Sequence, residues 1–283
     1  MIVVTGASGQ LGRLVIQSLL KTVPAAGIVA AVRQPASAAD LAALGVQVRQ
    51  ADYTQPATLD AAFQGATKVL LISSSAVGER VAQHGNVIDA ARRAGVALLA
   101  YTSLLHADTS PLGLAAEHTA TEALLRASGV PHVLLRNGWY TENYLASLPA
   151  VLQHGAVIGS AGEGRIASAA RADYAAAAAA VLTRDDQAGQ VHELAGDTAY
   201  TLAEFAAEVS RQTGRTIPYV NLPEADYRGA LLGAGLPEPI AHLLADSDVG
   251  ASKGGLFDDG HRLSALIGRP TATLAAMVEA ALR

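Results

Sequence analysis

Residues 1–20 read MIVVTGASGQLGRLVIQSLL, a short apolar run that enters a glycine-rich turn and leaves it in a helical pattern. Glycine stands at positions 6, 9 and 12, in the spacing G-x-x-G-x-x-G. The first glycine allows a sharp turn, the second leaves room for a ligand to approach the backbone, and the third lets the helix pack closely on the strand. This context predicts the first strand–turn–helix unit of a parallel sheet.

The beginning of the helix that follows the turn is suited to an anion. Its first N–H groups have no partner within the helix, and the aligned peptide dipoles leave positive charge there. The stretch expected to hold a pyrophosphate through these groups consists of Gly6, Ala7, Ser8, Gly9, Gln10 and Leu11. A tight turn without a ligand is the alternative, which the strand before it and the helix after it disfavour.

Downstream of this unit, short apolar runs alternate with helical patterns. Strands are expected at residues 2–5, 28–32, 46–49, 69–72, 98–102 and 133–135, with helices at 11–21, 37–44, 56–63, 80–94 and 114–128. Ser37 is expected to cap the second of these helices. Strands that are apolar throughout and alternate with helices are typical of a parallel sheet covered on both faces. The predicted fold class is therefore α/β, with a Rossmann-type doubly wound parallel sheet.

The pattern changes after about residue 145, where short possible strands mix with helices and with more Gly and Pro. These possible strands lie at 157–158, 191–194 and 217–220. We expect a smaller C-terminal α+β lobe, with residues 1–150 forming one domain and residues 151–283 the other. An alanine-rich helix at 172–182 could pack back on the sheet of the first domain.

Composition excludes several classes of function. The 283 residues are 51% hydrophobic and 16% charged, and the net charge of −5 argues against a nucleic-acid partner. There is no cysteine, so no disulfide or thiolate nucleophile is possible, and the histidines lack zinc-binding spacing, so no metal is expected. No basic leader precedes the first strand and no apolar stretch has membrane-spanning length. We expect a cytoplasmic protein with a small-molecule partner.

The end of the second expected strand reads AVRQP and bears on cofactor choice. NAD-binding sheets place a carboxylate there for the ribose 2′-OH, whereas an arginine suits a 2′-phosphate. Arg33 lies at this position, and no Asp or Glu occurs in the chain before Asp40. An ordinary exposed loop arginine is the alternative. The arginine and the missing carboxylate together predict NADPH as the cofactor.

Small and polar residues also follow the other expected strands. These residues are Asp52-Tyr53, Ser73-Ser74-Ser75, Thr102-Ser103 and Asn137-Gly138. Because ligands bind outside the carboxyl ends of parallel strands, we expect these positions to face the cofactor. For any one of them, ordinary turn chemistry is a strong alternative, so the set is more informative than its members.

Longer stretches narrow the class of protein. They read TGASGQLG, RQADY, LISSS, YTSLLHADTSPLGLA, LLRNGWYTENYLA, RADYAAAAA and ADSDVGASKGGLFDD. In these stretches the chain resembles the NmrA-like group of atypical short-chain dehydrogenases, and within it the bacterial NAD(P)H:quinone oxidoreductases of type 2. The resemblance runs almost from end to end. It implies an NADPH-binding domain, a smaller C-terminal domain, and hydride transfer from the nicotinamide to a quinone in the cleft between them.

The same resemblance implies a set of cofactor-binding residues. Residues 6–11 and Arg33 would hold the adenosine-phosphate part. The residues implied along the rest of the cofactor are Ser73, Ser74, Ser75, Asn137, Gly138, Trp139, Tyr140, Thr141 and Glu142. Arg171 is expected near the cleft, although a domain-packing salt bridge with Asp173 is an equally good interpretation.

The chain departs from the wider short-chain dehydrogenases in one respect. Those enzymes carry a Tyr-x-x-x-Lys proton donor on the helix after the fifth strand, where this chain reads EHTATE at 117–122. His118 and Glu122 lie one helical turn apart and could form an acid–base pair. We prefer the interpretation of a capped, solvated helix start. Quinone reduction tolerates the missing base, because a hydroquinone anion can take its proton from water.

The function predicted from the sequence is therefore that of an NADPH-dependent quinone oxidoreductase. The alternative is an NmrA-like redox sensor that binds NADP(H) without turnover. A scaffold with a vestigial site is disfavoured by the intact glycine turn, and a sugar epimerase by the absent Tyr and Lys. No sequence feature identifies a catalytic residue, the proton source, the physiological quinone or the oligomeric state.

Overall fold

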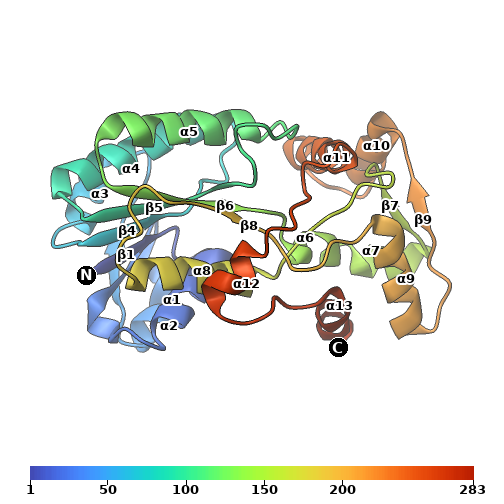
Figure 1. Ribbon diagram of the computed structural model, residues 1–283, viewed down its shortest axis with the longest axis horizontal. Helices are drawn as coiled ribbons and strands as arrows, with labels where there is room; N and C mark the ends of the chain where they lie inside the picture. Colours follow the sequence, from blue (N-terminus) through green and yellow to red (C-terminus); the bar gives the residue numbers. More distant parts are fainter. The chain divides into compact units, whose positions relative to one another are not determined.

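The computed structural model describes residues 1–283, which form two compact units, each assembled from separate stretches of the chain (Figure 1). The first unit comprises Met1–Leu104, Ala116–Asn137 and Arg171–His192. The second unit comprises Leu105–Ala115, Gly138–Ala170 and Glu193–Arg283. No helix in either unit is both long enough and apolar enough to cross a lipid bilayer.

A seven-stranded sheet organises the first unit, in the order β3-β2-β1-β4-β5-β6-β8. Its strands are β1 (Ile2–Thr5), β2 (Ile28–Val32), β3 (Gln47–Gln50), β4 (Lys68–Leu71), β5 (Leu98–Leu104), β6 (His132–Asn137) and β8 (Val191–Leu194). Strands β1 to β6 pair in parallel, and Ile2 of β1 lies opposite Ile28 on one side and Lys68 on the other. The strand order reverses beside β1, as in doubly wound sheets. The predicted fold class is confirmed.

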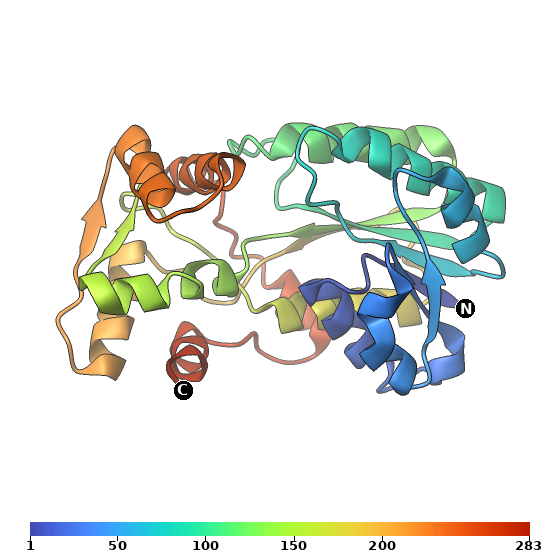
Figure 2. The same cartoon turned by 180° about the vertical axis from the view of Figure 1, so that it is seen from behind.

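Helices cover both faces of this sheet. In Figures 1 and 2, α3 (Pro56–Ala62), α4 (Arg80–Ala94) and α5 (Ala115–Ser128) lie on one face, and α1 (Gln10–Leu19), α2 (Ala39–Ala43) and α8 (Arg171–Thr183) lie on the other. Helix α1 is amphipathic, and its apolar residues Leu11, Val15, Ile16 and Leu19 are buried. Helix α8 is alanine-rich, which allows it to pack closely against α1.

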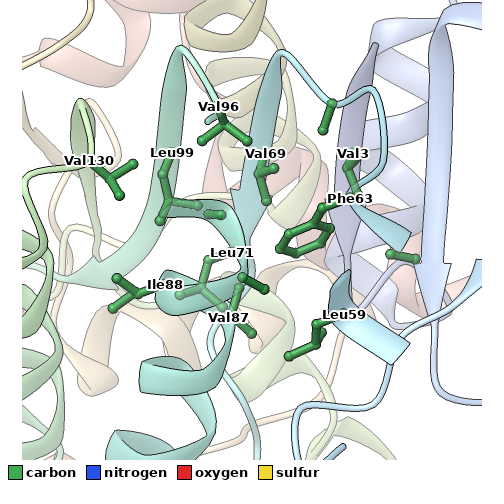
Figure 3. Close-up of a cluster of buried hydrophobic side chains, with 14 of the residues drawn as sticks. Val3, Leu59, Phe63, Val69, Leu71, Val87, Ile88, Val96, Leu99 and Val130 are labelled. Carbon is green, nitrogen blue, oxygen red and sulfur yellow. The ribbon is translucent and has the colours of Figure 1, made fainter. Parts of the chain in front are cut away.

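One hydrophobic core of the first unit lies between the sheet and the helices α3 and α4. Figure 3 shows branched side chains of the strands meeting Leu59 of α3, Phe63 directly after α3, and Val87 and Ile88 of α4. The side chains of Leu59, Phe63 and Val87 are fully buried. Because helices cover both faces of the sheet, apolar side chains on both sides of the central strands are buried. These strands are therefore continuously apolar and do not alternate with polar residues.

The second unit contains a small parallel sheet of two strands, β7 (Val157–Gly159) and β9 (Tyr219–Asn221). Its helices are α6 (Thr141–Leu145), α7 (Leu148–His154), α9 (Leu202–Thr213), α10 (Glu224–Gly233), α11 (Glu238–Ser252), α12 (Arg262–Ile267) and α13 (Leu274–Leu282). Helix α9 begins with a capping box between Thr201 and Glu204. Helix α10 packs on α11, and α13 packs on α9 and α6.

Two local expectations were wrong. Ser37 does not cap α2: it lies in a 3₁₀ turn at Pro35–Ala38, where its Oγ donates to Gln34 O at 2.7 Å, and the N-cap of α2 is Ala38. The strand at 191–194 was grouped with the C-terminal lobe, but it is β8 and pairs beside β6 in the large sheet. A four-residue strand carries no information about which sheet it will join, because its partner is set by tertiary packing.

Candidate cofactor site

The glycine turn between β1 and α1 requires glycine at two positions. Gly6 adopts a φ of +59°, in the left-handed region that favours glycine. A Cβ at Gly12 would lie 2.6 Å from Gly6 O and 2.7 Å from Ala7 Cα, which no side chain can tolerate. At Gly9 a Cβ would lie 3.2 Å from Gly6 O, so a side chain there makes a close contact but is not excluded. The third glycine thus allows α1 to pack against the turn, as the spacing predicts.

The first amides of α1 are available to a ligand. The N-cap residue, Gly9, has no side chain to accept from them, and the first helical hydrogen bond runs from Arg13 N to Gly9 O at 3.1 Å. The N–H groups of Gln10, Leu11 and Gly12 donate to no protein acceptor. Free amides at the positive end of a helix dipole fit a pyrophosphate, and the glycines leave room for it.

The end of β2 presents an arginine to solvent. Arg33 is exposed directly after the strand, and its positive charge helps to keep the pKa of Asp52 below its usual value, after the hydrogen bonds that Thr54 donates to that carboxylate. The first carboxylate of the chain, Asp40, forms an ion pair with Arg13. No unpaired carboxylate of the β2–α2 connection therefore opposes a 2′-phosphate at Arg33.

Two of the three serines after β4, Ser73 and Ser74, have different roles in the structure. All the polar groups of Ser74 form hydrogen bonds within the protein. Its N–H donates to His84 Nε2 at 2.9 Å and its Oγ donates to Gln83 Oε1 at 2.5 Å. Its carbonyl accepts from Arg80 Nε at 2.6 Å. Ser73 donates its N–H to Thr102 Oγ1 at 2.9 Å, but its buried Oγ has no hydrogen-bond partner. Of the two, Ser73 retains a hydroxyl for a ligand.

The predicted residues after β6 fall in two units. Asn137 ends the strand in the first unit, and its buried Oδ1 has no hydrogen-bond partner. The residues assigned to the second unit are Gly138, Trp139, Tyr140, Thr141 and Glu142. Thr141 is already occupied, because its Oγ1 bonds Ser168 Oγ at 2.8 Å. Trp139 is buried beside Tyr144, with ring centroids 6.4 Å apart.

Arg171 opens α8 in the first unit, the same unit as residues 6–11, Arg33, the serines and Asn137. Asp173, two residues further along α8, is buried. The role of Arg171 at the cofactor stays a prediction. The structure thus brings together in one unit the glycine turn after β1, the arginine after β2, the serines after β4 and the asparagine of β6, all at carboxyl ends of strands of the same sheet.

The interpretation of His118 and Glu122 as a solvated helix start was wrong. Both are buried, and they bond different partners: His118 Nδ1 lies 2.8 Å from Tyr101 Oη, while Glu122 accepts from Ser103 Oγ at 2.6 Å and from Arg136 Nη2 at 2.7 Å. Positions 118, 121, 122 and 125 form the inward face of α5, and all four residues are buried. In the sequence, this face could have been found from the apolar Leu125, which lies at helical spacing from His118 and Glu122.

Burial and nearby positive charge leave His118 unprotonated near pH 7, so it cannot serve as a general acid. Burial, followed by the positive charge of Arg80 and by His84, lowers the pKa of His118 to about 3. Burial and Arg80 likewise lower the pKa of His84 to about 4. The acceptor role of His84 Nε2 toward Ser74 places its proton on Nδ1, 3.0 Å from Thr121 Oγ1. Both imidazoles are therefore neutral near pH 7. His84 supports the β4–α4 loop through Ser74, and His118 bonds Tyr101 of β5, so neither is available as a proton donor to a substrate.

Sequence reasoning missed this buried polar network and another in the second unit. There, Asp248 of α11 is buried and accepts from Ser160 N at 2.9 Å and from Tyr144 Oη at 3.2 Å. Burial raises its pKa to about 6. A Cβ at Gly159 would lie 2.6 Å from Asp248 Oδ2, so glycine makes room for the carboxylate. No local pattern reveals such a contact, because 88 residues separate Ser160 from Asp248.

The glycine turn, free amides and polar strand ends describe a dinucleotide-binding protein, and comparison with known families agrees. The chain belongs to the NAD(P)H-binding family, whose sequence profile matches residues 6–185. Among its relatives, quinone oxidoreductase 2 of Escherichia coli (strain K12) is 63% identical over 278 residues, which cover 98% of this chain and 97% of that protein.

Solved structures show the same similarity. NADPH-dependent quinone oxidoreductase QOR2 of Escherichia coli, complexed with NADPH, superposes with a TM-score of 0.98 at 62% identity, covering 100% of both chains. Triphenylmethane reductase of Citrobacter sp., complexed with NADP(H), gives a TM-score of 0.96 at 39% identity, covering 99% of this chain and 100% of that one. The resemblance predicted from the sequence is confirmed.

Proposed function

We propose that the protein is an NADPH-dependent quinone oxidoreductase. The observation that carries this proposal is the 63% identity to quinone oxidoreductase 2 over 98% of the chain. The glycine turn, the exposed Arg33 and the unpartnered atoms of Ser73 and Asn137 support it independently, because they suit a phosphorylated dinucleotide. Bound NADPH supplies a hydride from C4 of its nicotinamide ring.

The residues of the first unit act by binding and orientation. The amides at 10–12 hold the pyrophosphate, Arg33 bonds the 2′-phosphate, and Ser73 Oγ and Asn137 Oδ1 bond polar groups of the cofactor. Fixing the reacting atoms in place supplies most of the acceleration that a hydride transfer to an electrophilic quinone needs. The roles of residues 138–142 and Arg171, and the division at residue 150, remain part of the proposal.

No side chain of α5 is required as a base. The helix face that carries Tyr-x-x-x-Lys in short-chain dehydrogenases here carries His118 and Glu122, both consumed in buried hydrogen bonds. Water then supplies the proton that completes the hydroquinone. We also place the protein in the cytoplasm and assign it no nucleic-acid partner, since a net charge of −5 disfavours phosphate backbones.

Steady-state oxidation of NADPH against a panel of quinones tests the function. The purified protein, without added metal or flavin, is expected to oxidise NADPH with simple benzoquinones and to yield one hydroquinone per NADPH. Alcohols and sugars serve as controls and should give no turnover. Tight NADPH binding without turnover of any quinone would contradict the proposal and indicate a redox sensor.

Arg33→Ala tests cofactor choice. Loss of the charge-assisted bond to the 2′-phosphate should cost about 1.5–3 kcal/mol of NADPH binding, or about 10- to 100-fold in Kd. NADH lacks that phosphate, so its Kd should remain nearly unchanged. Calorimetric titration of both cofactors measures the difference. Equal weakening of the two would show that Arg33 supports the fold and does not bind the phosphate.

His118→Gln tests the proton source. The structure predicts only a modest loss in kcat, because the imidazole is buried, neutral and bonded to Tyr101. A general acid would cost about 10²–10⁴-fold. The quinone assay measures this directly, with thermal unfolding as a check on folding. A loss in the larger range, in a folded variant, would restore His118 as the acid.

A further inference from the structure

Arg13 links three segments around the adenosine end of the predicted cofactor site. It lies in the first turn of α1, one residue after Gly12. Its Nε donates to Ser8 O in the glycine turn at 3.0 Å, its Nη2 donates to Ser37 O at 2.7 Å, and its Nη1 pairs with Asp40 of α2. All of the guanidinium nitrogens are therefore bound to other parts of the first unit.

The contact at Ser37 extends to Arg33. Ser37 bonds back to Gln34 O twice, from its N–H at 3.0 Å and from its Oγ at 2.7 Å. Gln34 directly follows Arg33. A continuous set of hydrogen bonds thus runs from the glycine turn through Arg13 and Ser37 to the residue beside Arg33. The pyrophosphate position and the 2′-phosphate position are held at a set distance by this connection.

The shape of the guanidinium matters more here than its charge. Asp40 is 60% exposed and Arg13 is 31% exposed, and exposed ion pairs contribute little to stability. The bonds to Ser8 O and Ser37 O are made to backbone carbonyls in two different segments, which a planar fork of donors can reach at once. A lysine keeps the positive charge but cannot bond both carbonyls and the carboxylate in the same geometry.

We propose that Arg13 is a positioning residue that, by bracing the β2–α2 connection against the glycine turn, holds Arg33 at the 2′-phosphate and so sets the preference for NADPH over NADH. This inference rests on the proposed function. Loss of the brace affects NADPH more than NADH, because only NADPH uses Arg33. The hydrogen bond from Arg13 keeps the pKa of Asp40 below its usual value, so this exposed carboxylate stays ionised, but the brace itself consists of the two bonds to the carbonyls of Ser8 and Ser37.

Kd values for NADPH and NADH, measured by calorimetry without quinone, test this inference. Arg13→Lys should raise the Kd of NADPH about 10-fold, as for one lost charge-assisted bond, and change that of NADH less than about 3-fold. Asp40→Asn leaves both carbonyl bonds in place, so the NADPH:NADH ratio should stay within about 3-fold of the wild type. Arg93→Ala, which removes the exposed pair with Asp60, is the matched control and should change neither Kd.

Three outcomes would overturn the inference. Wild-type selectivity in Arg13→Lys would mean that charge alone suffices. Selectivity lost equally in Asp40→Asn would assign the effect to the ion pair. Equal weakening of both cofactors, with a lowered melting temperature, would assign Arg13 to the fold. Because no quinone is present, failure of the proposed reductase activity would leave these results unaffected, and the two failures are distinguishable.

Discussion

Replacing Gly9 with valine is expected to abolish NADPH binding while the fold survives. The backbone at Gly9 is extended, with φ −76° and ψ 170°, so valine is allowed there. Its Cβ would lie 3.2 Å from Gly6 O, and its methyl groups would fill the space in front of the free amides at 10–12. Loss of two amide–phosphate bonds, at about 1.5–3 kcal/mol each, corresponds to at least about 100-fold in Kd.

Gly12→Ala provides the contrast for this experiment. Its Cβ would collide with backbone atoms of the turn at 2.6 and 2.7 Å, so this variant should lose stability as well as binding. Circular dichroism and calorimetry of both variants separate the two effects. An unchanged NADPH affinity in folded Gly9→Val would show that the pyrophosphate does not lie over this turn.

The second large effect is expected at Glu122. Burial opposes ionisation of this carboxyl, but the hydrogen bonds from Arg136 and Ser103 outweigh burial and hold its pKa below the usual value. Glu122→Ala removes the carboxylate that pairs with the guanidinium of Arg136, itself 6% exposed. Breaking one side of a buried ion pair costs about 3–5 kcal/mol, which urea unfolding measures. Asp60→Ala, which breaks an exposed pair, should cost less than about 1 kcal/mol.

The same carboxyl adds a pH dependence. Because the folded pKa lies below the unfolded value of about 4.5, this stability is present above pH 4.5 and is lost as pH falls through the lower, folded pKa. Glu122→Gln removes this titration and keeps much of the volume. If the wild type and both variants unfold at the same urea concentration, Glu122 does not support the fold.

The parts of the molecule that depend on local pattern were predictable. The glycine turn combines a steric requirement at Gly12 with a positive φ at Gly6, and both are visible as spacing. Strands β1 and β2 and helix α4 were predicted with their observed bounds. Apolar strands in a parallel sheet are buried on both faces, so their sequence leaves little ambiguity.

The parts that depend on distant partners were not predictable. Glu122 looks like a solvent-exposed helix residue until β6 places Arg136 beside it, 14 residues further along the chain. Strand β8 has only four residues, and tertiary packing, not its own composition, determines that it pairs beside β6. The brace by Arg13 also joins segments 24 and 27 residues apart through backbone carbonyls and one carboxylate, and no motif records such bonds.

The packing of α1 on α8 has a consequence during synthesis. Helix α1 ends at Leu19, and its partner α8 ends at Thr183, about 160 residues later. At ribosomal rates of about 5–20 residues per second, α8 is completed on the order of 10 s after α1. The apolar residues Leu11, Val15 and Leu19 of α1 are therefore synthesised well before α8 can pack against that helix.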